Sequence, residues 1–315
     1  MPLASIDIGT NTIILLIAEK ENNTLRTIHH ECQMPRLGED INKTRSLKPE
    51  AINRSLDVLK NYKKTIERYQ CEQIILIATA ACRKAQNILD FTTRVQEKLG
   101  LNIMIIPGEE EARLIHKTCA IEFKELGPPF IVLDIGGGST EIITDSGDNV
   151  TYNSLDFGVV TLTQKFLHTN PPTAHEIESL REHIKNQLAS HTVRSTQHAA
   201  RPLIATAGTP TTLSAIHQKL PSYDGNKVHK SKLTRQELQE LTEKLANMSL
   251  GQRCQIPCLP PKRADVIIAG CIILDTVMEK LNIQEFHISD HGLAHGILYE
   301  VITYFKFDPF WSLHY

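Results

Sequence analysis

The sequence Ile6-Asp7-Ile8-Gly9-Thr10-Asn11-Thr12 is nearly repeated near the middle of the chain as Leu133-Asp134-Ile135-Gly136-Gly137-Gly138-Ser139-Thr140. Each copy is an apolar strand that ends in an acidic residue, then a turn of small and polar residues, then a second apolar strand. This order predicts a β-hairpin rather than the strand-to-helix turn of the commoner nucleotide-binding loops. Two matching hairpins predict two related α/β domains with one active site between them.

The residue types of both turns suit an anionic ligand. Glycine lets the backbone approach an anion closely, and successive N–H groups can then point into one concavity. The phosphate-binding residues predicted in the two turns are Gly9, Thr10, Asn11, Gly136, Gly137, Gly138, Ser139 and Thr140. Asp7 and Asp134 would repel a phosphate unless a hard cation lay between them. We therefore predict Mg²⁺, bound by carboxylate and phosphate oxygens.

Composition limits the class of protein. A chain of 315 residues, 41% hydrophobic and 22% charged, suits a globular protein of two domains. A net charge of −2 gives no general attraction to a polyanion, so no nucleic-acid partner is predicted. Met1 leads almost directly into the first strand, and no apolar run approaches the ~18 residues that span a bilayer. We expect a cytoplasmic protein with no membrane partner.

The seven cysteines suggest reduced thiols rather than a disulfide framework, because they are odd in number and scattered. Cys254 and Cys258 form one C-x-x-x-C without a second pair, so a zinc site is not predicted there. His291 and His295, placed four apart on one predicted helix, could in principle bind a metal. We favour ordinary histidines at these positions because no other clear ligand accompanies them.

Hydrophobic periodicity predicts two similar series of elements. The first has strands at 3–8, 13–19, 25–31, 73–78 and 102–106, with helices at 49–69, 87–99 and 109–121. The second has strands at 130–135, 141–144, 150–156, 202–206 and 286–289, with helices at 160–168, 174–191, 211–220, 234–247, 264–281 and 293–304. Gly127-Pro128-Pro129 marks the expected boundary between domains 1–126 and 127–315, although the last helix could pack back on the first domain.

A third loop, from Ala205 to Thr212, runs from a strand into a helix. Thr209 is the expected N-cap, with Pro210 in the first turn, and the helix dipole would favour an anion there. Gly208 and Thr209 are therefore added to the candidate phosphate-binding residues. A plain capped helix is the alternative interpretation.

Taken together, these segments resemble the exopolyphosphatase and guanosine pentaphosphate phosphatase (Ppx/GppA) family, which lies in the actin-like, sugar-kinase and Hsp70 ATPase-fold superfamily. The resemblance covers almost the whole chain and is specific in the order of its motifs. The motifs are DIGTNT from Asp7, RLGE from Arg36, ATAACRKAQN from Ala78, GEEEARL from Gly108, DIGGGSTE from Asp134, LDFGVVTLT from Leu155, TAGTPTTL from Thr206 and RADVIIAG from Arg263. The resemblance implies two actin-like (ribonuclease H-like) domains with a phosphate-binding cleft between them.

The resemblance also implies roles for individual residues. Glu111 corresponds to the catalytic base, and Asp134 and Glu141 to acidic residues around the metal and the attacking water. The implied metal ligands are Asp7, Asp134 and Glu141. Arg83 stands at the arginine of the family's A-T-x-A-x-R segment and becomes a phosphate ligand, for which a planar guanidinium is well suited. The resemblance further suggests a homodimer, for which the apolar tail Phe305 to Trp311 could supply an interface.

Two departures from the family pattern affect what can be inferred. Ile13-Ile14 stands where the family commonly has an arginine after the first loop, and Gly292-Leu293-Ala294-His295-Gly296 replaces the usual G-L-R-E-G. The resemblance further leads us to expect a chain without the additional C-terminal domains of longer members. We therefore expect a short form that lacks the extended channel gripping long polymers.

The leading hypothesis is a Mg²⁺-dependent hydrolase that removes the terminal phosphate from inorganic polyphosphate, favouring short chains. A pppGpp 5′-phosphohydrolase that forms ppGpp is the near alternative, because it would share the mechanism. An actin-like ATP-binding kinase or ATPase is less favoured, since Glu111 stands beside Arg113 and no sugar-binding motif is recognisable. A regulatory module that binds polyphosphate or nucleotide without turnover also stays open.

Overall fold

The computed structural model describes residues 1–22, 24–190 and 201–303, which form two compact units. Unit 1 comprises Met1–Ile121 and the segment that starts at Gly292, and unit 2 comprises Glu122–His291. These divisions differ from the expected domains 1–126 and 127–315. The first division comes earlier because Phe123 already packs in unit 2, with its ring 5.5 Å from that of His229. The second division, after His291, arises because the last helix packs on unit 1, where Ser5 Oγ donates to Ala294 O at 2.7 Å.

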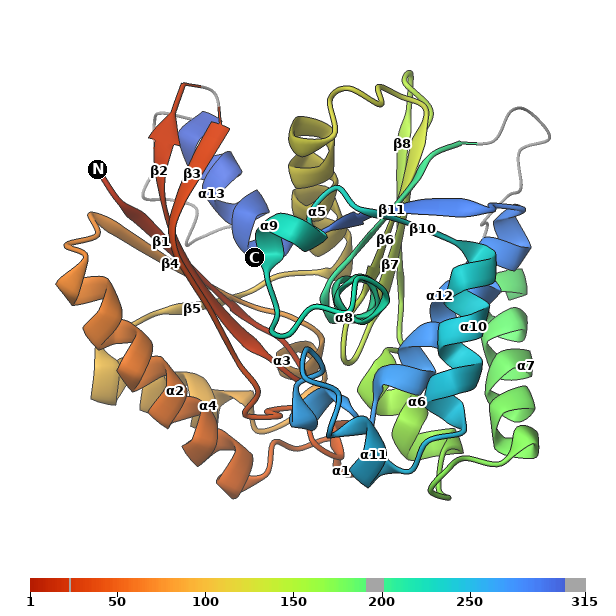
Figure 1. Cartoon of the computed structure of the whole chain (residues 1–315). Helices are drawn as coiled ribbons and strands as arrows, with labels where there is room; N and C mark the ends of the chain where they lie inside the picture. Colours follow the sequence, from red (N-terminus) through yellow and green to blue (C-terminus); the bar gives the residue numbers. More distant parts are fainter. Residues whose placement is uncertain (23, 191–200, 304–315) are drawn as a thin grey trace. The chain divides into compact units, whose positions relative to one another are not determined.

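Unit 1 is built on one sheet with the strand order β3-β2-β1-β4-β5 (Figure 1). Its strands are β1 (Leu3–Ile8), β2 (Ile13–Glu21), β3 (Thr24–Gln33), β4 (Gln73–Ala78) and β5 (Ile103–Ile105). Its helices are α1 (Ile41–Thr44), α2 (Pro49–Arg68), α3 (Ala80–Lys84), α4 (Ile88–Leu99), α5 (Gly108–Glu122) and α13 (Leu293–Thr303). The first three strands pair antiparallel, whereas β4 runs parallel to both β1 and β5. Figure 1 shows α2 and α4 on one side of this sheet and α13 on the other.

Unit 2 is built on a second sheet with the order β10-β11-β9-β6-β7-β8. Its strands are β6 (Phe130–Ile135), β7 (Thr140–Asp145), β8 (Val150–Leu155), β9 (Leu203–Thr206), β10 (Lys232–Thr234) and β11 (Glu285–Ser289). Its helices are α6 (Val159–Phe166), α7 (Ala174–Ser190), α8 (Gly208–His217), α9 (Gly225–Val228), α10 (Arg235–Ala246), α11 (Leu250–Arg253) and α12 (Ile267–Leu281), with a 3₁₀ turn η1 at Pro261–Arg263.

The two sheets share one topology. In unit 2 the strands β8, β7 and β6 form an antiparallel meander, β9 pairs parallel to β6, and β11 pairs parallel to β9. This is the arrangement of β3, β2, β1, β4 and β5 in unit 1, with β10 added antiparallel at one edge. The α/β fold with two series of related elements, predicted from the repeated hairpin, is therefore confirmed.

Each unit has its own apolar core. In unit 1, Ile6 and Leu15 of the sheet are fully buried in one cluster with Phe91 of α4. In unit 2, every residue of α12 from Ile267 to Met278 is buried. A helix that is apolar on all sides is a buried one, so α12 forms the centre of the second core. None of the helices in the described ranges is long and apolar enough to cross a membrane.

Helix α13 packs closely on α5 within unit 1. A Cβ atom on Gly296 would lie 2.3 Å from Leu114 O, so only glycine permits this approach. The Glu300 carboxylate then pairs with Arg113 at 2.9 Å and with Lys117 at 2.7 Å. These contacts anchor α5, the helix that carries Glu111.

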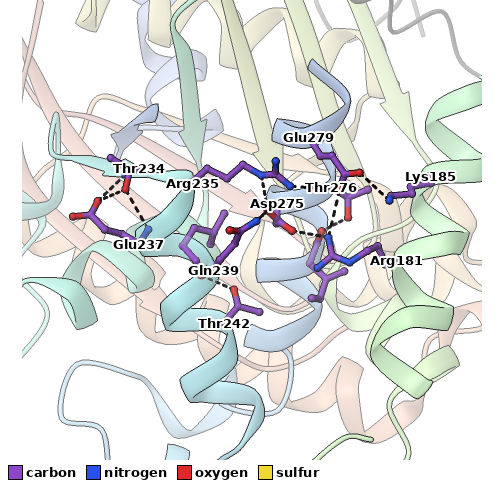
Figure 2. Close-up of polar contacts among 12 residues, drawn as sticks. Arg181, Lys185, Thr234, Arg235, Glu237, Gln239, Thr242, Asp275, Thr276 and Glu279 are labelled. Atoms are coloured by element: carbon purple, nitrogen blue, oxygen red, sulfur yellow. Dashed lines mark hydrogen bonds and ion pairs between the residues drawn. The ribbon is translucent and has the colours of Figure 1, made fainter. Parts of the chain in front are cut away.

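A network of charged side chains joins three helices of unit 2 around Asp275 (Figure 2). The buried Asp275 carboxylate of α12 accepts hydrogen bonds from Arg181 of α7 at 2.5 Å, and from Arg235 at 2.8 Å and Gln239 at 3.0 Å, both of α10. Burial alone would raise the pKa of Asp275, but the hydrogen bonds and charges of the two arginines outweigh burial and lower it. The network therefore holds a carboxylate, not a carboxylic acid, at neutral pH.

We expect Asp275→Asn to lower the free energy of unfolding by about 3 kcal/mol at pH 7, because it removes one partner of a buried ion pair. The lowered pKa of Asp275 determines how its contribution to stability changes with pH. The stabilisation is complete above the pKa of the unfolded state and is lost as the pH falls through the lower folded pKa. Urea unfolding of both proteins from neutral to acid pH would measure this. Glu279→Gln, at a side chain 40% exposed, is the control, with an expected change below about 1 kcal/mol. A constant difference down to strongly acid pH would contradict the assignment.

Several local predictions were wrong. The helix after β9 begins at Gly208 with Ala207 as its N-cap, so Thr209 is not the cap. Helix α13 begins at Leu293, so His291 precedes it and does not share a helical face with His295. The short elements α1, α3, α9, α11 and β10 were not predicted, because they carry too few residues for a periodic pattern. The apolar tail 305–311 lies outside the described residues.

Candidate active site

The first hairpin turn connects β1 to β2 in unit 1. Gly9 N donates to Thr12 O at 2.9 Å, and Asp7 lies one residue before the end of β1, opposite Ile14. Thr10 and Asn11 are 3% and 7% exposed, and Thr10 Oγ1 and Asn11 Oδ1 have no hydrogen-bond partner among the described residues. Buried polar atoms normally have partners. These two atoms are therefore available to a bound ligand or its hydration shell.

The segment Arg36–Glu39 supports this turn. Gly38 N donates to Thr10 O at 2.9 Å, and Arg36 N donates to Asn11 O at 3.1 Å. A Cβ on Gly38 would lie 2.4 Å from Thr10 Cγ2, so the support requires glycine at that position. The RLGE motif thus acts through the backbone, which the sequence alone did not indicate.

The second hairpin turn, between β6 and β7 in unit 2, repeats the first. Gly136 N donates to Ser139 O at 3.1 Å, as Gly9 N donates to Thr12 O. The start of α6 then closes over the glycines, because Val159 N donates to Gly136 O at 3.0 Å and Val160 N to Gly137 O at 2.9 Å. These bonds occupy loop carbonyls and fix the backbone of the turn.

Gly158 allows α6 to approach this closely. A Cβ there would lie 2.4 Å from Gly136 O and 2.5 Å from the carbonyl carbon of Gly137. Its backbone is extended, so steric contact rather than dihedral strain requires glycine. Sequence reasoning did not single out Gly158, although it stands inside the LDFGVVTLT motif.

Asp134 and Glu141 face each other across β6 and β7. They are directly opposed in the register, Asp134 is 8% exposed and Glu141 is 1% exposed. Ser154 Oγ donates to Glu141 Oε1 at 2.8 Å. Like charges directly opposite on neighbouring strands are unfavourable unless a cation lies between them. This pair therefore suits a hard divalent cation, whereas the corresponding pair in unit 1 is Asp7 and Ile14.

The polar residues of the second turn have separate roles. Thr140 is fully buried, and its hydroxyl donates to Phe157 O at 2.8 Å. Its single proton thus stabilises the scaffold instead of being directed to an anion. Ser139, 3% exposed, lies within the turn itself, directly after the three glycines.

Arg83 and Glu111 meet in unit 1. Arg83 lies on α3, which follows β4, and Glu111 lies in the first turn of α5. Arg83 Nη1 donates to Glu111 Oε2 at 2.7 Å and to Ile106 O at 3.0 Å. Burial raises the pKa of Glu111, while the charge and hydrogen bond of Arg83 oppose that shift. A buried carboxylate beside a guanidinium is the environment in which enzymes adjust a general base.

The third loop joins β9 to α8 in unit 2. Arg263 Nη1 donates to Gly208 O at 3.1 Å and to Thr212 Oγ1 at 2.7 Å. A Cβ on Gly208 would lie 2.6 Å from Arg263 Cζ, so the guanidinium packs directly against the glycine. The Thr209 hydroxyl points toward Gly270 of α12, where a Cβ would come within 2.2 Å of it. Gly208 and Arg263 thus shape this loop, while the Thr209 side chain is committed to packing.

The structure therefore brings the candidate residues together in groups within each unit. Unit 1 holds Arg83 with Glu111, and the Asp7 hairpin with its support. Unit 2 holds Asp134 with Glu141, and the glycine turn with α6. The remaining candidates, Gly208 and Thr209, are the first two residues of α8 in unit 2.

Known proteins resemble this chain over most of its length. The chain is 33% identical over 308 residues to exopolyphosphatase 2 of Mycobacterium tuberculosis, covering 94% of this chain and 97% of that protein. It is 29% identical to a guanosine-5′-triphosphate,3′-diphosphate pyrophosphatase of Photobacterium profundum, covering 95% of this chain and 59% of that longer protein.

A solved structure gives the same result for the fold. The crystal structure of the Aquifex aeolicus member of the Ppx/GppA family has a TM-score of 0.79 and 30% identity, covering all of this chain and 99% of that one. The expected actin-like α/β fold is thereby confirmed. The sequence model of the Ppx/GppA phosphatase family matches residues 16–305 of this chain. On this sequence match and this structural likeness, the chain belongs to the Ppx/GppA phosphatase family.

Proposed function

We propose that this protein is an exopolyphosphatase that hydrolyses the terminal phosphoanhydride bond of short inorganic polyphosphate chains. The observation that carries the proposal is the buried Glu111 carboxylate, held 2.7 Å from Arg83 and raised in pKa by its burial. Phosphoryl transfer to water needs positioning and charge neutralisation more than covalent chemistry. A relative named exopolyphosphatase 2, matched over 97% of its length, supports the same activity.

Glu111 is the proposed base that orients and deprotonates the attacking water. Arg83 is the proposed partner of the terminal phosphate oxygens, because a guanidinium can bind two oxygens in one plane. In the resting protein the two side chains neutralise each other. A bound phosphate would compete for Arg83 and leave the Glu111 carboxylate to accept a proton.

Mg²⁺ is the proposed metal. The opposed Asp134 and Glu141 carboxylates fit it, because hard oxygen ligands suit Mg²⁺ and their mutual repulsion calls for a cation. When bound, the ion would neutralise phosphate charge. The turn at Gly136–Thr140 would bind phosphate mainly through the backbone, since the Thr140 hydroxyl is already engaged, whereas the turn at Gly9–Asn11 would also offer the Thr10 hydroxyl.

The second candidate is the 5′-phosphohydrolase reaction that converts pppGpp to ppGpp. It is favoured by the likeness to the guanosine-5′-triphosphate,3′-diphosphate pyrophosphatase of Photobacterium profundum. The same residues would serve both substrates, because the bond and the attacking water are alike. Discrimination then depends on contacts to the guanosine.

Phosphate release would test the proposal. The purified protein with Mg²⁺ is given short polyphosphate, long polyphosphate, pppGpp and ATP in parallel, with and without a chelator. Fastest release from short polyphosphate, abolished by the chelator, is the expected result. A preference for pppGpp would favour the second candidate, and turnover of ATP alone would overturn both.

We also propose that the protein works in the cytoplasm as a homodimer. All seven cysteines lie in the described part of the chain, and none is in a disulfide. Thiols persist in reducing compartments, which supports the location. Sedimentation of the purified chain would test the dimer.

We expect Arg83→Ala to weaken substrate binding more at low salt than at high salt, because its attraction for phosphate is electrostatic and is screened by ions. Burial raises the pKa of Glu111, and the Arg83 charge lowers it. The same change removes that charge, so the pKa of Glu111 should rise further. KM for polyphosphate at several ionic strengths, together with the acid limb of the rate profile, measures both effects. Lys84→Ala, on the same short helix, is the control. An effect independent of salt would point to damage to the fold.

A further inference from the structure

Three side chains with metal-binding atoms gather in unit 2, and none of them is among the candidate active-site residues. Glu122 is the last residue of α5, His229 caps the C-terminal end of α9, and His291 lies two residues after β11. His291 Nδ1 lies 3.0 Å from Glu122 Oε1, and His229 Nε2 lies 3.6 Å from Glu122 Oε2. One ligand atom from each residue can be chosen so that all three lie within 4.8 Å of one another.

The backbone positions of both histidines are fixed. His229 N donates to Gly225 O at 2.8 Å, which closes the turn of α9. His291 O accepts hydrogen bonds from Ser289 Oγ at 2.7 Å and from Thr206 Oγ1 at 3.3 Å. The two rings consequently stack, with centroids 4.1 Å apart and planes inclined by 21°. Little reorganisation is needed for both rings to serve one ligand.

The 3.0 Å between His291 and Glu122 would also allow a direct hydrogen bond, but the longer distance between His229 and Glu122 would not. An N···O separation of 3.6 Å is too long for a normal hydrogen bond. Two ligands on a tetrahedral ion with bonds of about 2.0–2.1 Å would be roughly 3.3–3.4 Å apart. The observed 3.0 Å and 3.6 Å lie on either side of that value. Two stacked imidazolium rings would repel each other, whereas two neutral rings and one carboxylate can share a cation.

We propose that Glu122, His229 and His291 bind a divalent transition metal ion of the Zn²⁺ type. Two imidazole nitrogens and one carboxylate oxygen form a borderline-soft ligand set, which Mg²⁺ does not favour. The side chains are 15–26% exposed, so the ion can enter and water can complete its coordination. Coordination through His229 Nε2 leaves the ring proton on Nδ1. The long 3.3 Å contact from Asp290 N to that Nδ1 must then open.

The position of the site suggests its role. Glu122 is the first residue of unit 2 and His291 is its last, so one ion would join the two ends of this unit. His229 would attach both ends to the interior segment that follows α8. The ion would act as a structural clamp on unit 2, and it would be separate from the all-oxygen Asp134–Glu141 pair.

Zinc binding by the full-length protein would test the proposal. The protein is stripped with a chelator, supplied with Zn²⁺ in the presence of excess Mg²⁺, and analysed by equilibrium dialysis and thermal unfolding. Co²⁺ replaces Zn²⁺ in a parallel sample, because its visible absorption reports nitrogen ligands and low coordination number. The variants are Glu122→Gln, His229→Gln and His291→Gln. His287→Gln is the matched control, since His287 also lies beside Phe123 but is not one of the three ligands.

We expect the native chain and His287→Gln to bind one more equivalent of Zn²⁺ than each of the three variants. Loss of supporting residues around metals costs 10–100-fold in affinity, so loss of a ligand should cost at least about 100-fold. Zn²⁺ should raise the unfolding temperature of the native chain and not that of the variants. Equal binding by all five proteins, or no bound zinc in the native chain, would overturn the proposal. Asp134→Asn should keep this zinc, which separates the outcome from that for the hydrolytic site.

Discussion

Glu111→Gln should lower the turnover number for polyphosphate by about 10²–10⁴-fold, which is the usual contribution of a positioned general base. Glutamine keeps the shape of the side chain and an oxygen that can accept from Arg83, so the fold and KM should change little. Single-turnover phosphate release and polyphosphate binding, measured on the same protein, would separate chemistry from affinity. Turnover equal to that of the native protein would remove Glu111 from the mechanism.

Glu109→Gln is the matched control for this change. Glu109 lies two residues earlier on α5 and is exposed, so it tests the loss of one negative charge from the same helix turn. We expect nearly native turnover from it. A loss as large as that of Glu111→Gln would indicate that the charge of the helix start, and not a base, matters for the reaction.

The pH dependence of the native enzyme gives a second check on Glu111. A base must be deprotonated to act, and burial raises the pKa of this carboxyl. The rate should therefore fall as the pH drops through that raised pKa, at a higher pH than for an ordinary glutamate near 4.3. The residual activity of Glu111→Gln should lack this acid limb. An unchanged limb in the variant would assign it to another group.

Gly158→Ala should reduce kcat/KM by about tenfold to a hundredfold, because displacement of a reacting group by about 1 Å can cost that much. The added Cβ would lie 2.4 Å from Gly136 O, and neither backbone can move without breaking the bonds from Val159 and Val160. The glycine turn would then shift away from its phosphate-binding position. KM for polyphosphate should rise more than kcat falls.

Gly251→Ala is the control for the added methyl group. It lies in α11 of the same unit, where a new Cβ would lie 3.9 Å from Ser249 Oγ, an ordinary van der Waals distance. This variant should keep native activity and stability. If Gly158→Ala behaved in the same way, the close packing of α6 would have no part in forming the phosphate turn.

The repeated hairpin made much of the fold predictable. Strands 3–8, 73–78 and 130–135 were predicted with their observed bounds, because each is a short apolar run that ends at a turn of polar or small residues. The predicted helix ends differ from the observed ones by a few residues. Helix α8, for example, begins at Gly208 and not at 211, after Ala207 with a φ of 72°, which no local sequence pattern predicts. Short elements such as α3 and β10 were not predicted, because they form through contacts with neighbouring segments and carry no periodic pattern.

For the candidate site, the sequence by itself determined the chemical groups: two hairpins of the same kind, each with an aspartate, and the motifs that contain Arg83 and Glu111. Only the tertiary structure decided which groups meet. Arg83 and Glu111 lie 28 positions apart and are joined at 2.7 Å because α3 and α5 follow the neighbouring parallel strands β4 and β5. Gly158 matters because the backbone of the glycine turn lies against it, and Gly38 matters because the Thr10 side chain does. Periodicity and residue type report local preference, whereas contacts between distant segments depend on packing that no single segment encodes.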